Sequence, residues 1–160
     1  MARYVVTVDI NRPPRVVWDF FDTPENAPRY VEGCISCTHV SGVRKGVGTR
    51  VLRVASVGGA APIDSTEDVL EYEDGSYARR KGRVSWYCTY EATTRVEPLE
   101  SGGGSRVTLD YTYRPTVTAM LTIVFWPLFL AAMSGRIDRL ADAAKRVLGS
   151  EDNGAYRAAG

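Results

Sequence analysis

The residues of this sequence that could do chemistry are polar and aromatic side chains in its middle part, where the pattern is typical of strands. They are Asp68, Arg80, Trp86, Tyr90, Tyr111 and Tyr113. A tyrosine hydroxyl that reaches into a cavity can orient a carbonyl or hydroxyl group by hydrogen bonding. If Arg80 faces inward, it and Asp68 could form a buried polar pair in an otherwise apolar cavity. The alternative for each aromatic side chain is ordinary core packing, where aromatic stripes usually belong.

Two other motifs suggest metal, redox or general-base chemistry, and both have a plainer interpretation. Cys34 and Cys37 form a C-x-x-C motif, but zinc would need further ligands, and strand residues three apart point to opposite faces. His39 is the only histidine, so no histidine-based triad can be assembled, although it could act as a general base if it faced a cavity. We therefore expect two ordinary half-buried thiols, no metal and no cofactor, and we assign no catalytic residue.

The elements that must position these side chains follow from periodicity and turn residues. Residues 3–10 alternate as a strand, Pro13-Pro14 opens a helix, and Pro24 begins a short second helix. The first helix is expected to bury Val16, Val17, Phe20 and Phe21. Six further strands are expected at 35–40, 47–57, 63–72, 76–83, 84–96 and 106–114. Hairpin-connected strands with segregated helices predict an α+β fold: a seven-stranded antiparallel curved sheet that grips a long C-terminal helix, with two short helices after strand 1.

The C-terminal helix, from about residue 116 to 148, has two different halves. The second half is amphipathic and places Ile137, Leu140, Ala141, Ala144, Val147 and Leu148 on one face. The first half is apolar nearly all round, and Pro127 should bend it near Ile123. The bend would close a lid over a cavity, with the ligand contacted by Ile123, Trp126, Phe129, Leu130 and Met133. The opposite stripe would need cover from a homodimer partner, the first short helices or a membrane surface.

Length and composition predict one soluble domain and exclude several classes of protein. The chain has 160 residues, 44% hydrophobic and 24% charged, and we expect a single helix-grip domain over 1–149 with a disordered tail at 150–160. A net charge of +1 provides no overall field that would recruit nucleic acid or an acidic membrane. Three cysteines argue against a disulfide scaffold, and residues 1–9 do not resemble a signal peptide, so a cytoplasmic protein is expected. The apolar stretch 117–133 is short for a membrane span and contains Pro127.

Three segments carry a family resemblance. They are the stretch from Pro14 to Tyr30, the later Gly46-Val47-Gly48-Thr49-Arg50, and Trp126-Pro127-Leu128 in the last helix. With the order of elements, they resemble the polyketide cyclase/dehydrase branch of the START-like (Bet v 1-like, SRPBCC) helix-grip superfamily, over residues 3–148. The resemblance implies a deep apolar pocket gripped by the C-terminal helix, holding a lipid, a polyketide or another hydrophobic small molecule. The motifs mark helix starts and turns and name no catalyst, so the fold does not settle the function.

Three hypotheses stay open at this point. The first is binding or carrying of a hydrophobic small molecule between the sheet and the C-terminal helix. The second is a polyketide cyclase or dehydratase in which Tyr90, Tyr111, Arg80 and Asp68 polarise a ketone or move a proton. The third is docking on a membrane or a protein partner through the apolar half of the last helix. The sequence favours the first hypothesis, because the lid is rich in apolar and aromatic residues and no reactive triad converges.

Overall fold

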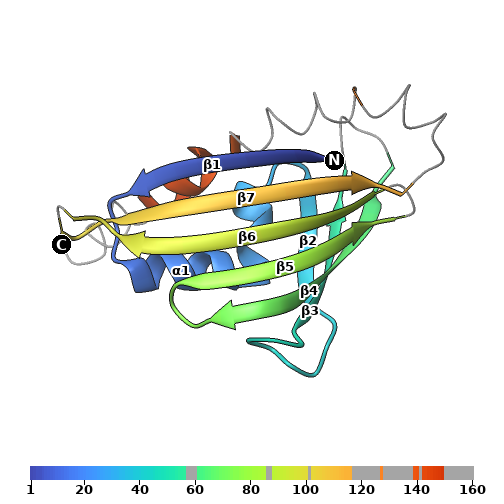
Figure 1. The fold of residues 1–160 in the computed structure, drawn as a ribbon, viewed down its shortest axis with the longest axis horizontal. Coiled ribbons are helices and arrows are strands. Elements are labelled where there is room, and N and C mark those ends of the chain that lie inside the picture. Colours follow the sequence, from blue (N-terminus) through green and yellow to red (C-terminus); the bar gives the residue numbers. More distant parts are fainter. Residues whose placement is uncertain are drawn as a thin grey trace, which may run out of the picture.

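The core of the architecture is one antiparallel sheet. The fold is taken from a computed structural model, which describes residues 1–56, 61–85, 88–100, 102–116, 127, 139–140 and 142–149. The strands are β1 (Ala2–Ile10), β2 (Cys34–His39), β3 (Arg50–Ala55), β4 (Ile63–Glu73), β5 (Tyr77–Val84), β6 (Cys88–Pro98) and β7 (Ser105–Pro115). Their order in the sheet is β1-β7-β6-β5-β4-β3-β2, and every neighbouring pair is antiparallel (Figure 1). The predicted fold class is confirmed.

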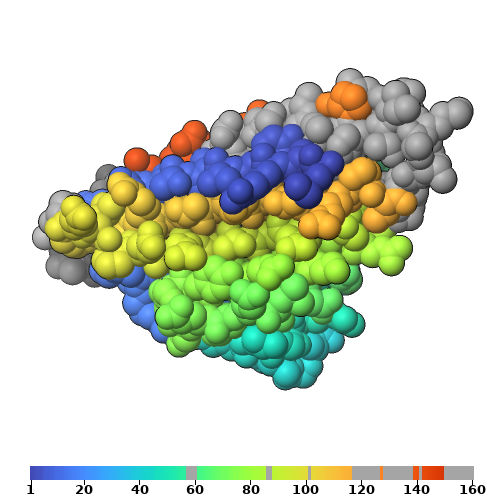
Figure 2. Space-filling model, viewed as in Figure 1, coloured from blue at the N-terminus to red at the C-terminus, as the bar shows by residue number. Residues whose placement is uncertain are grey.

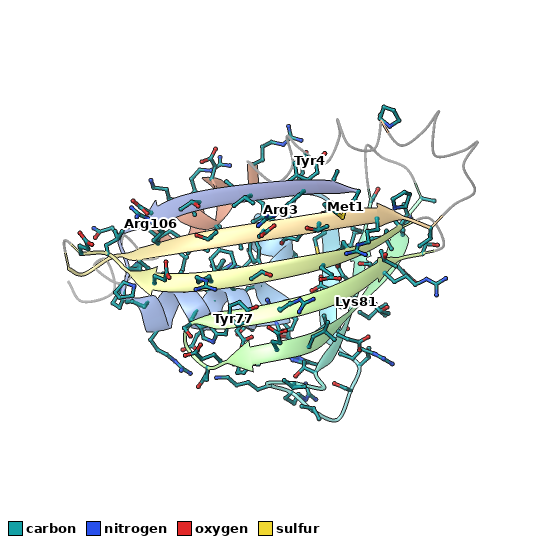
Figure 3. The ribbon with its side chains drawn as sticks, viewed as in Figure 1. Met1, Arg3, Tyr4, Tyr77, Lys81 and Arg106 are labelled. Atoms are coloured by element: carbon teal, nitrogen blue, oxygen red, sulfur yellow. The ribbon has the colours of Figure 1, made fainter. Side chains whose placement is uncertain are left out.

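The two faces of the sheet differ because side chains alternate along each strand. On β7, Val107, Leu109 and Tyr113 are buried, as their alternation predicts. The opposite face carries cross-strand ion pairs, with Arg3 bound to Asp110 and Arg106 to Asp9. Figure 3 shows this outer face toward the viewer, and Figure 2 shows its space-filling surface. The helices lie behind the sheet in Figure 1, so any site between sheet and helices is on the inner face.

Three short helical elements follow β1: α1 (Pro14–Asp22), η1 (Pro24–Asn26) and α2 (Ala27–Tyr30). Proline occupies an early position in each, where its missing N–H costs nothing. The predicted apolar face of α1 is wrong at one residue, since Val16 is 44% exposed and Trp18 is fully buried. Trp18 packs edge-on against Tyr72 of β4 with ring centroids 5.7 Å apart. The larger indole ring fills the space that α1 leaves over the sheet.

The described helical residues 139–140 and 142–149 form the C-terminal helical segment, which packs where its amphipathic pattern predicts. Leu140, Ala144 and Leu148 are buried in one cluster with residues of α1 and the inner face of the sheet. Arg12 donates a hydrogen bond from Nε to the carbonyl oxygen of Leu148 (3.1 Å), which fixes the end of the segment. The core is therefore closed by this segment and α1 together.

Other expectations for the C-terminal region fall outside the described residues. They are the lid residues Ile123, Trp126, Phe129, Leu130 and Met133, the bend near Ile123 and the tail at 150–160. Pro127 is described, and it is helical and exposed. Among the described residues, no helix is long and apolar enough to cross a membrane.

Two strand boundaries differ from their predicted positions because the backbone turns there. The predicted strand at 47–57 begins only at Arg50, since Gly46 and Gly48 both adopt φ +90°, a left-handed conformation that glycine reaches without a steric penalty. The predicted strand at 84–96 begins at Cys88, after Ser85 with φ 45°. The first turn places Thr49 at the start of the inner face, where it lines the cavity described below.

Candidate functional site

A cavity of about 60 Å³ lies between the inner face of the sheet and the helical elements. Its lining comes from α1, η1, α2, the six strands β2 to β7, the loop between β2 and β3, and the C-terminal helical segment. The lining residues are Phe21, Asp22, Pro24, Ala27, Tyr30, Cys37, Arg44, Lys45, Gly46, Thr49, Val51, Arg53, Glu67, Val69, Arg80, Ala92, Thr94, Leu109, Tyr111 and Leu140. Since one water needs about 10–15 Å³ of such space, the cavity has room for several water-sized groups. Within the described residues it is smaller and more polar than the deep apolar pocket that the resemblance implies.

A buried charged network forms the inner wall of this cavity. Glu67 of β4 is only 5% exposed, and its Oε1 lies 2.7 Å from Nη2 of Arg53 on β3. The Tyr90 hydroxyl on β6 donates to the same Oε1 at 2.6 Å. Burial by itself would raise the pKa of Glu67, but the charge of Arg53 and the Tyr90 hydrogen bond outweigh it and lower that pKa. Glu67 is therefore a buried carboxylate that stays ionised at neutral pH.

A glycine on the neighbouring strand makes this network sterically feasible. Gly82 of β5 is the cross-strand partner of Tyr90, and a Cβ at Gly82 would overlap the tyrosine ring and its hydroxyl. The absence of a side chain lets the Tyr90 ring lie across β5, so that its hydroxyl reaches Glu67 on β4. An isolated glycine in a strand often marks such a close approach, and it is the sequence signal that could have pointed to this network.

Two polar atoms in the cavity wall are left unpaired. Oγ1 of Thr49 and Nε of Arg53 are both buried with no hydrogen-bond partner among the described residues. Both residues line the cavity, and Thr49 is 5% exposed. A buried polar group without a partner costs about 1–3 kcal/mol, so native proteins usually satisfy it with water or a ligand. These two atoms mark the place where a guest molecule would gain hydrogen bonds.

Arg80 and Asp68 do not form the predicted buried pair. Asp68 lies on the outer face, where it accepts a hydrogen bond from Arg50 Nε at 2.6 Å. Arg80 faces inward as hypothesised, but its partner is Asp22 at the end of α1 (3.2 Å), and it also donates to Thr94 Oγ1 (3.2 Å). The register explains the error, because Arg80 opposes Val69 and Asp68 occupies the alternate position. The Asp68–Arg80 prediction is therefore wrong in its acidic partner.

The aromatic candidates occupy different positions. Tyr111 lines the cavity, and burial raises the pKa of its hydroxyl. Tyr113 packs in a neighbouring cluster with Tyr4 and Tyr90, and its ring is 5.6 Å from that of Tyr90. Tyr90 is not among the lining residues, and its hydroxyl donates a hydrogen bond to Glu67, which is. Trp86 lies outside the described residues.

Of the two thiols expected to be half-buried, Cys34 is half-buried and Cys37 is buried. Cys37 is buried in the cavity wall, and burial raises the pKa of its thiol to about 11, while Cys34 is half-buried. His39 Nδ1 lies 3.4 Å from a carboxylate oxygen of Glu25, away from the cavity lining. Within the described ranges, no group of three or more histidine, cysteine or acidic side chains could hold a metal ion.

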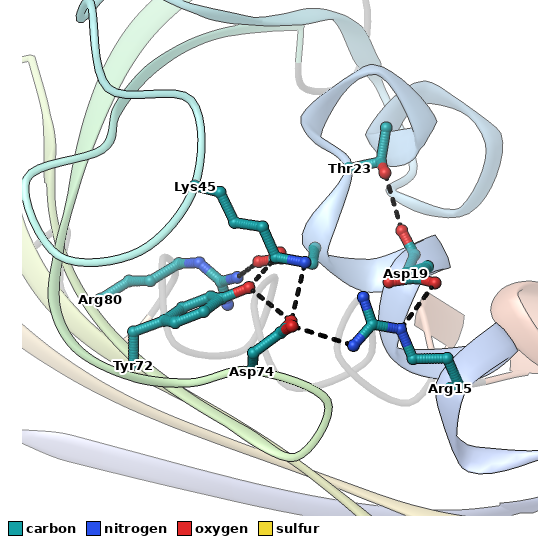
Figure 4. Close-up of polar contacts among 8 residues, drawn as sticks. Arg15, Asp19, Thr23, Lys45, Tyr72, Asp74 and Arg80 are labelled. Atoms are coloured by element: carbon teal, nitrogen blue, oxygen red, sulfur yellow. Dashed lines mark hydrogen bonds and ion pairs between the residues drawn. The ribbon is translucent and has the colours of Figure 1, made fainter.

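An ionic cluster includes Lys45, which lines the cavity, and is drawn in Figure 4. Asp74, in the turn between β4 and β5, pairs with Lys45 of the β2–β3 loop (2.7 Å) and with Arg15 of α1 (3.0 Å). The Tyr72 hydroxyl contacts Asp74 at 3.2 Å and Asp22 at 2.7 Å, which links the cluster to the Arg80–Asp22 pair inside. Lysine and arginine hydrogen bonds hold the pKa of Asp74 well below its usual range. The β4–β5 turn, the β2–β3 loop and α1 are thus joined at one carboxylate.

Solved structures show the same fold at low sequence identity. A protein from Thermus thermophilus, TTHA0849, matches with a TM-score of 0.76 and 22% identity, covering 94% of this chain and 99% of its own. A START superfamily protein from Mycobacterium smegmatis matches with a TM-score of 0.75 and 11% identity, covering 92% and 97%. The Zhui aromatase/cyclase from Streptomyces sp. R1128 matches with a TM-score of 0.73 and 13% identity, covering 99% and 98%. No curated protein sequence matches the chain.

The family comparison agrees with the order of elements and with the position of the cavity. Residues 1–149 match the family described as polyketide cyclase / dehydrase and lipid transport. That match covers β1 through the C-terminal helical segment, so it spans every element that lines the cavity. The chain belongs to this polyketide cyclase/dehydrase and lipid transport family.

Proposed function

We propose that the protein binds a hydrophobic small molecule in the cavity between sheet and helices, and that an oxygen of this ligand accepts hydrogen bonds from Thr49 and Arg53. The observation that carries the proposal is the pair of unpaired polar atoms, Thr49 Oγ1 and Arg53 Nε, in the wall of one cavity. Both atoms can donate a hydrogen bond, so they suit a carbonyl or hydroxyl oxygen. The lipid transport in the family's description supports the apolar character of the ligand.

Charge pairing inside the cavity favours a ligand that is neutral where it is buried. Arg53 is neutralised by Glu67, and Arg80 by Asp22. An ionised ligand group buried beside these pairs would find both arginines already neutralised, and its desolvation would cost a large free energy. A ketone or alcohol instead satisfies the two unpaired atoms without disturbing either pair. The proposed class is therefore a hydrophobic molecule with at least one carbonyl or hydroxyl oxygen.

The decisive variant is Thr49→Val, which removes the hydroxyl and keeps the shape of the side chain. The probe is prodan, a neutral naphthalene ketone whose emission reports an apolar site. We expect Thr49→Val to weaken prodan binding about tenfold, the value of one hydrogen bond, with an unchanged or higher melting temperature. Thr66→Val on the outer strand face is the matched control and should change neither quantity. Native mass spectrometry of the purified protein should also detect a bound apolar compound.

Two outcomes would overturn the binding proposal. One is a protein that takes up neither prodan nor any apolar compound during expression. The other is equal prodan affinity in the wild type and Thr49→Val, since the hydroxyl would then have no role in holding an oxygen.

The second candidate is a cyclase or dehydratase, and one observation favours it: the buried hydrogen bond from Tyr90 to Glu67 couples a proton donor to a carboxylate beside the cavity. The electrostatics count against it. A general base works best with a pKa near the working pH, whereas the pKa of Glu67 is lowered and that of Tyr90 is raised well above its ordinary value. Conversion of a poly-β-ketone into a ring product, lost in Arg80→Gln, would favour the enzyme over the binding protein.

A further inference from the structure

The loop between β2 and β3, residues 40–49, exposes apolar side chains to solvent. Val40, Val43 and Val47 are 52%, 45% and 62% exposed. They are three of the eight large apolar side chains that are exposed among the described residues, and they fall within ten positions. Single exposed valines are normal on a protein surface, but a concentration in one loop is typical of an interaction site. Figure 1 shows the loop in cyan, projecting from the lower edge of the sheet, and Figure 2 shows the same edge as surface.

Internal hydrogen bonds fix the shape of this loop. Ser41 Oγ donates to the carbonyl oxygen of Val43 (2.7 Å) and accepts from the Arg50 amide (2.8 Å). The Thr49 amide donates to the Gly46 carbonyl (3.2 Å), and Lys45 is held by Asp74. The loop therefore has a defined conformation in which its valines face solvent, so no large ordering cost accompanies an interaction through them.

The charge of the loop indicates the kind of surface that it meets. Residues 40–49 contain Arg44 and Lys45 and no acidic residue. Lys45 is paired with Asp74, while Arg44 is exposed and has no ion-pair partner among the described residues. Apolar side chains next to an unpaired cation are the combination that enters the interface of an anionic bilayer, where the chain gains both burial and attraction to lipid phosphates.

We propose that the β2–β3 loop docks on the surface of an anionic lipid bilayer, with Val43 and Val47 entering the interface and Arg44 binding lipid headgroups. The same loop forms part of the cavity wall, because Arg44, Lys45 and Gly46 line the cavity. Docking through this loop brings that side of the cavity against the membrane, so a hydrophobic molecule passes between bilayer and cavity without crossing open water. The residues proposed to meet the membrane, Val43, Arg44 and Val47, are different from Thr49 and Arg53, so docking can be tested by variants that leave Thr49 and Arg53 in place.

The test is flotation of the full chain with vesicles of phosphatidylcholine alone or of phosphatidylcholine mixed with phosphatidylglycerol. The wild type should float with the mixed vesicles at low salt, much less at high salt, and not with phosphatidylcholine alone. Val43→Ser combined with Val47→Ser should reduce the bound fraction about tenfold, and Arg44→Gln should reduce it about fivefold. The matched controls are Ile35→Ser, an exposed apolar residue on β2, and Lys81→Gln, an exposed cation on β5; both should float like the wild type.

Several results would overturn the docking proposal. Absence of flotation with the mixed vesicles at low salt is one. Flotation that survives both loop variants is another, because the contact would then lie elsewhere, for example on the apolar half of the last helix. If flotation falls in Arg44→Gln but not in the double valine variant, the contact is purely electrostatic and insertion of the valines is excluded. Circular dichroism of each variant checks that a loss of flotation does not come from unfolding.

Discussion

Replacing Tyr90 by phenylalanine tests the buried network most directly. The substitution removes one hydroxyl that donates a 2.6 Å hydrogen bond to the buried Glu67 carboxylate. A hydrogen bond to a charged group contributes about 1.5–3 kcal/mol to stability, and Arg53 remains to hold the carboxylate. For a chain of this length 1 kcal/mol corresponds to roughly 2–4 °C in melting temperature, so Tyr90→Phe should melt about 3–12 °C lower at neutral pH.

The stability difference between Tyr90→Phe and the wild type should depend on pH, because the hydrogen bond from Tyr90 stabilises the ionised form of Glu67. Because the folded-state pKa of Glu67 is lowered, its stabilising contribution is fully present above the unfolded value near 4.5 and is lost as the pH falls through the folded value. Tyr90→Phe removes one of the three groups that lower this pKa, and Arg53 and Arg80 remain. The variant should therefore lose stability at a higher pH than the wild type, and the difference between them should shrink in acid as Glu67 becomes protonated.

The assay is urea unfolding followed by circular dichroism at several pH values from neutral to acidic. Tyr77→Phe is the matched control, since its hydroxyl donates to an exposed Glu71 at 3.0 Å and should contribute less than about 0.5 kcal/mol. Equal stability of Tyr90→Phe and wild type at neutral pH would refute the reasoning, as would a difference that does not change with pH.

Three further predictions follow from the same packing. Gly82→Ala should destabilise the fold by roughly 3 kcal/mol or expel the Tyr90 ring from its place, seen as a lower urea midpoint; wild-type stability would contradict this geometry. Leu148→Ala should cost about 2–5 kcal/mol because the side chain is buried against α1 and the sheet, and a loss below about 1 kcal/mol would mean that the C-terminal helical segment is not docked. In the folded protein at mildly alkaline pH only the half-buried thiol of Cys34 should react quickly with Ellman's reagent, since burial raises the pKa of each of the other two to about 11; rapid reaction of all three would contradict that burial.

Much of the fold could be predicted because it depends on patterns that survive in a single sequence. The alternation along β7 predicted which residues face inward, and the i, i+4, i+8 spacing of Leu140, Ala144 and Leu148 predicted how the last helix packs. Both patterns reflect burial of a whole face, so one anomalous residue does not erase them. The buried face of α1 was predicted wrongly at Val16, because Val16 and Trp18 are both apolar and the space over the sheet decides which of them is buried.

The candidate site was harder to predict because its polar residues lie on a buried face. Along β4, Glu67 and Asp68 are adjacent acids, and the pattern gives no reason to bury one rather than the other. The decision depends on Arg53, which neutralises Glu67 from the neighbouring strand, and on the register that β3 and β4 adopt. Arg53 and Thr49 were missed for the same reason, since their pairing and their unpaired atoms are properties of the assembled sheet. The signal in the sequence that could have pointed to this network is Gly82, an isolated glycine within a strand.

The carboxylate of Asp74 has a consequence for how the cavity exchanges its contents with the surroundings. Its partners Lys45 and Arg15 are about half exposed, and surface ion pairs of this kind contribute about 0–1 kcal/mol each. Moving the part of the β2–β3 loop around Lys45 away from α1 therefore costs little, while the hydrogen bonds of Gly48 and Thr49 to Val69 keep the base of the loop on β4. We expect this side of the cavity to open more often than the whole protein unfolds, so raised ionic strength should speed guest exchange while leaving the melting temperature almost unchanged.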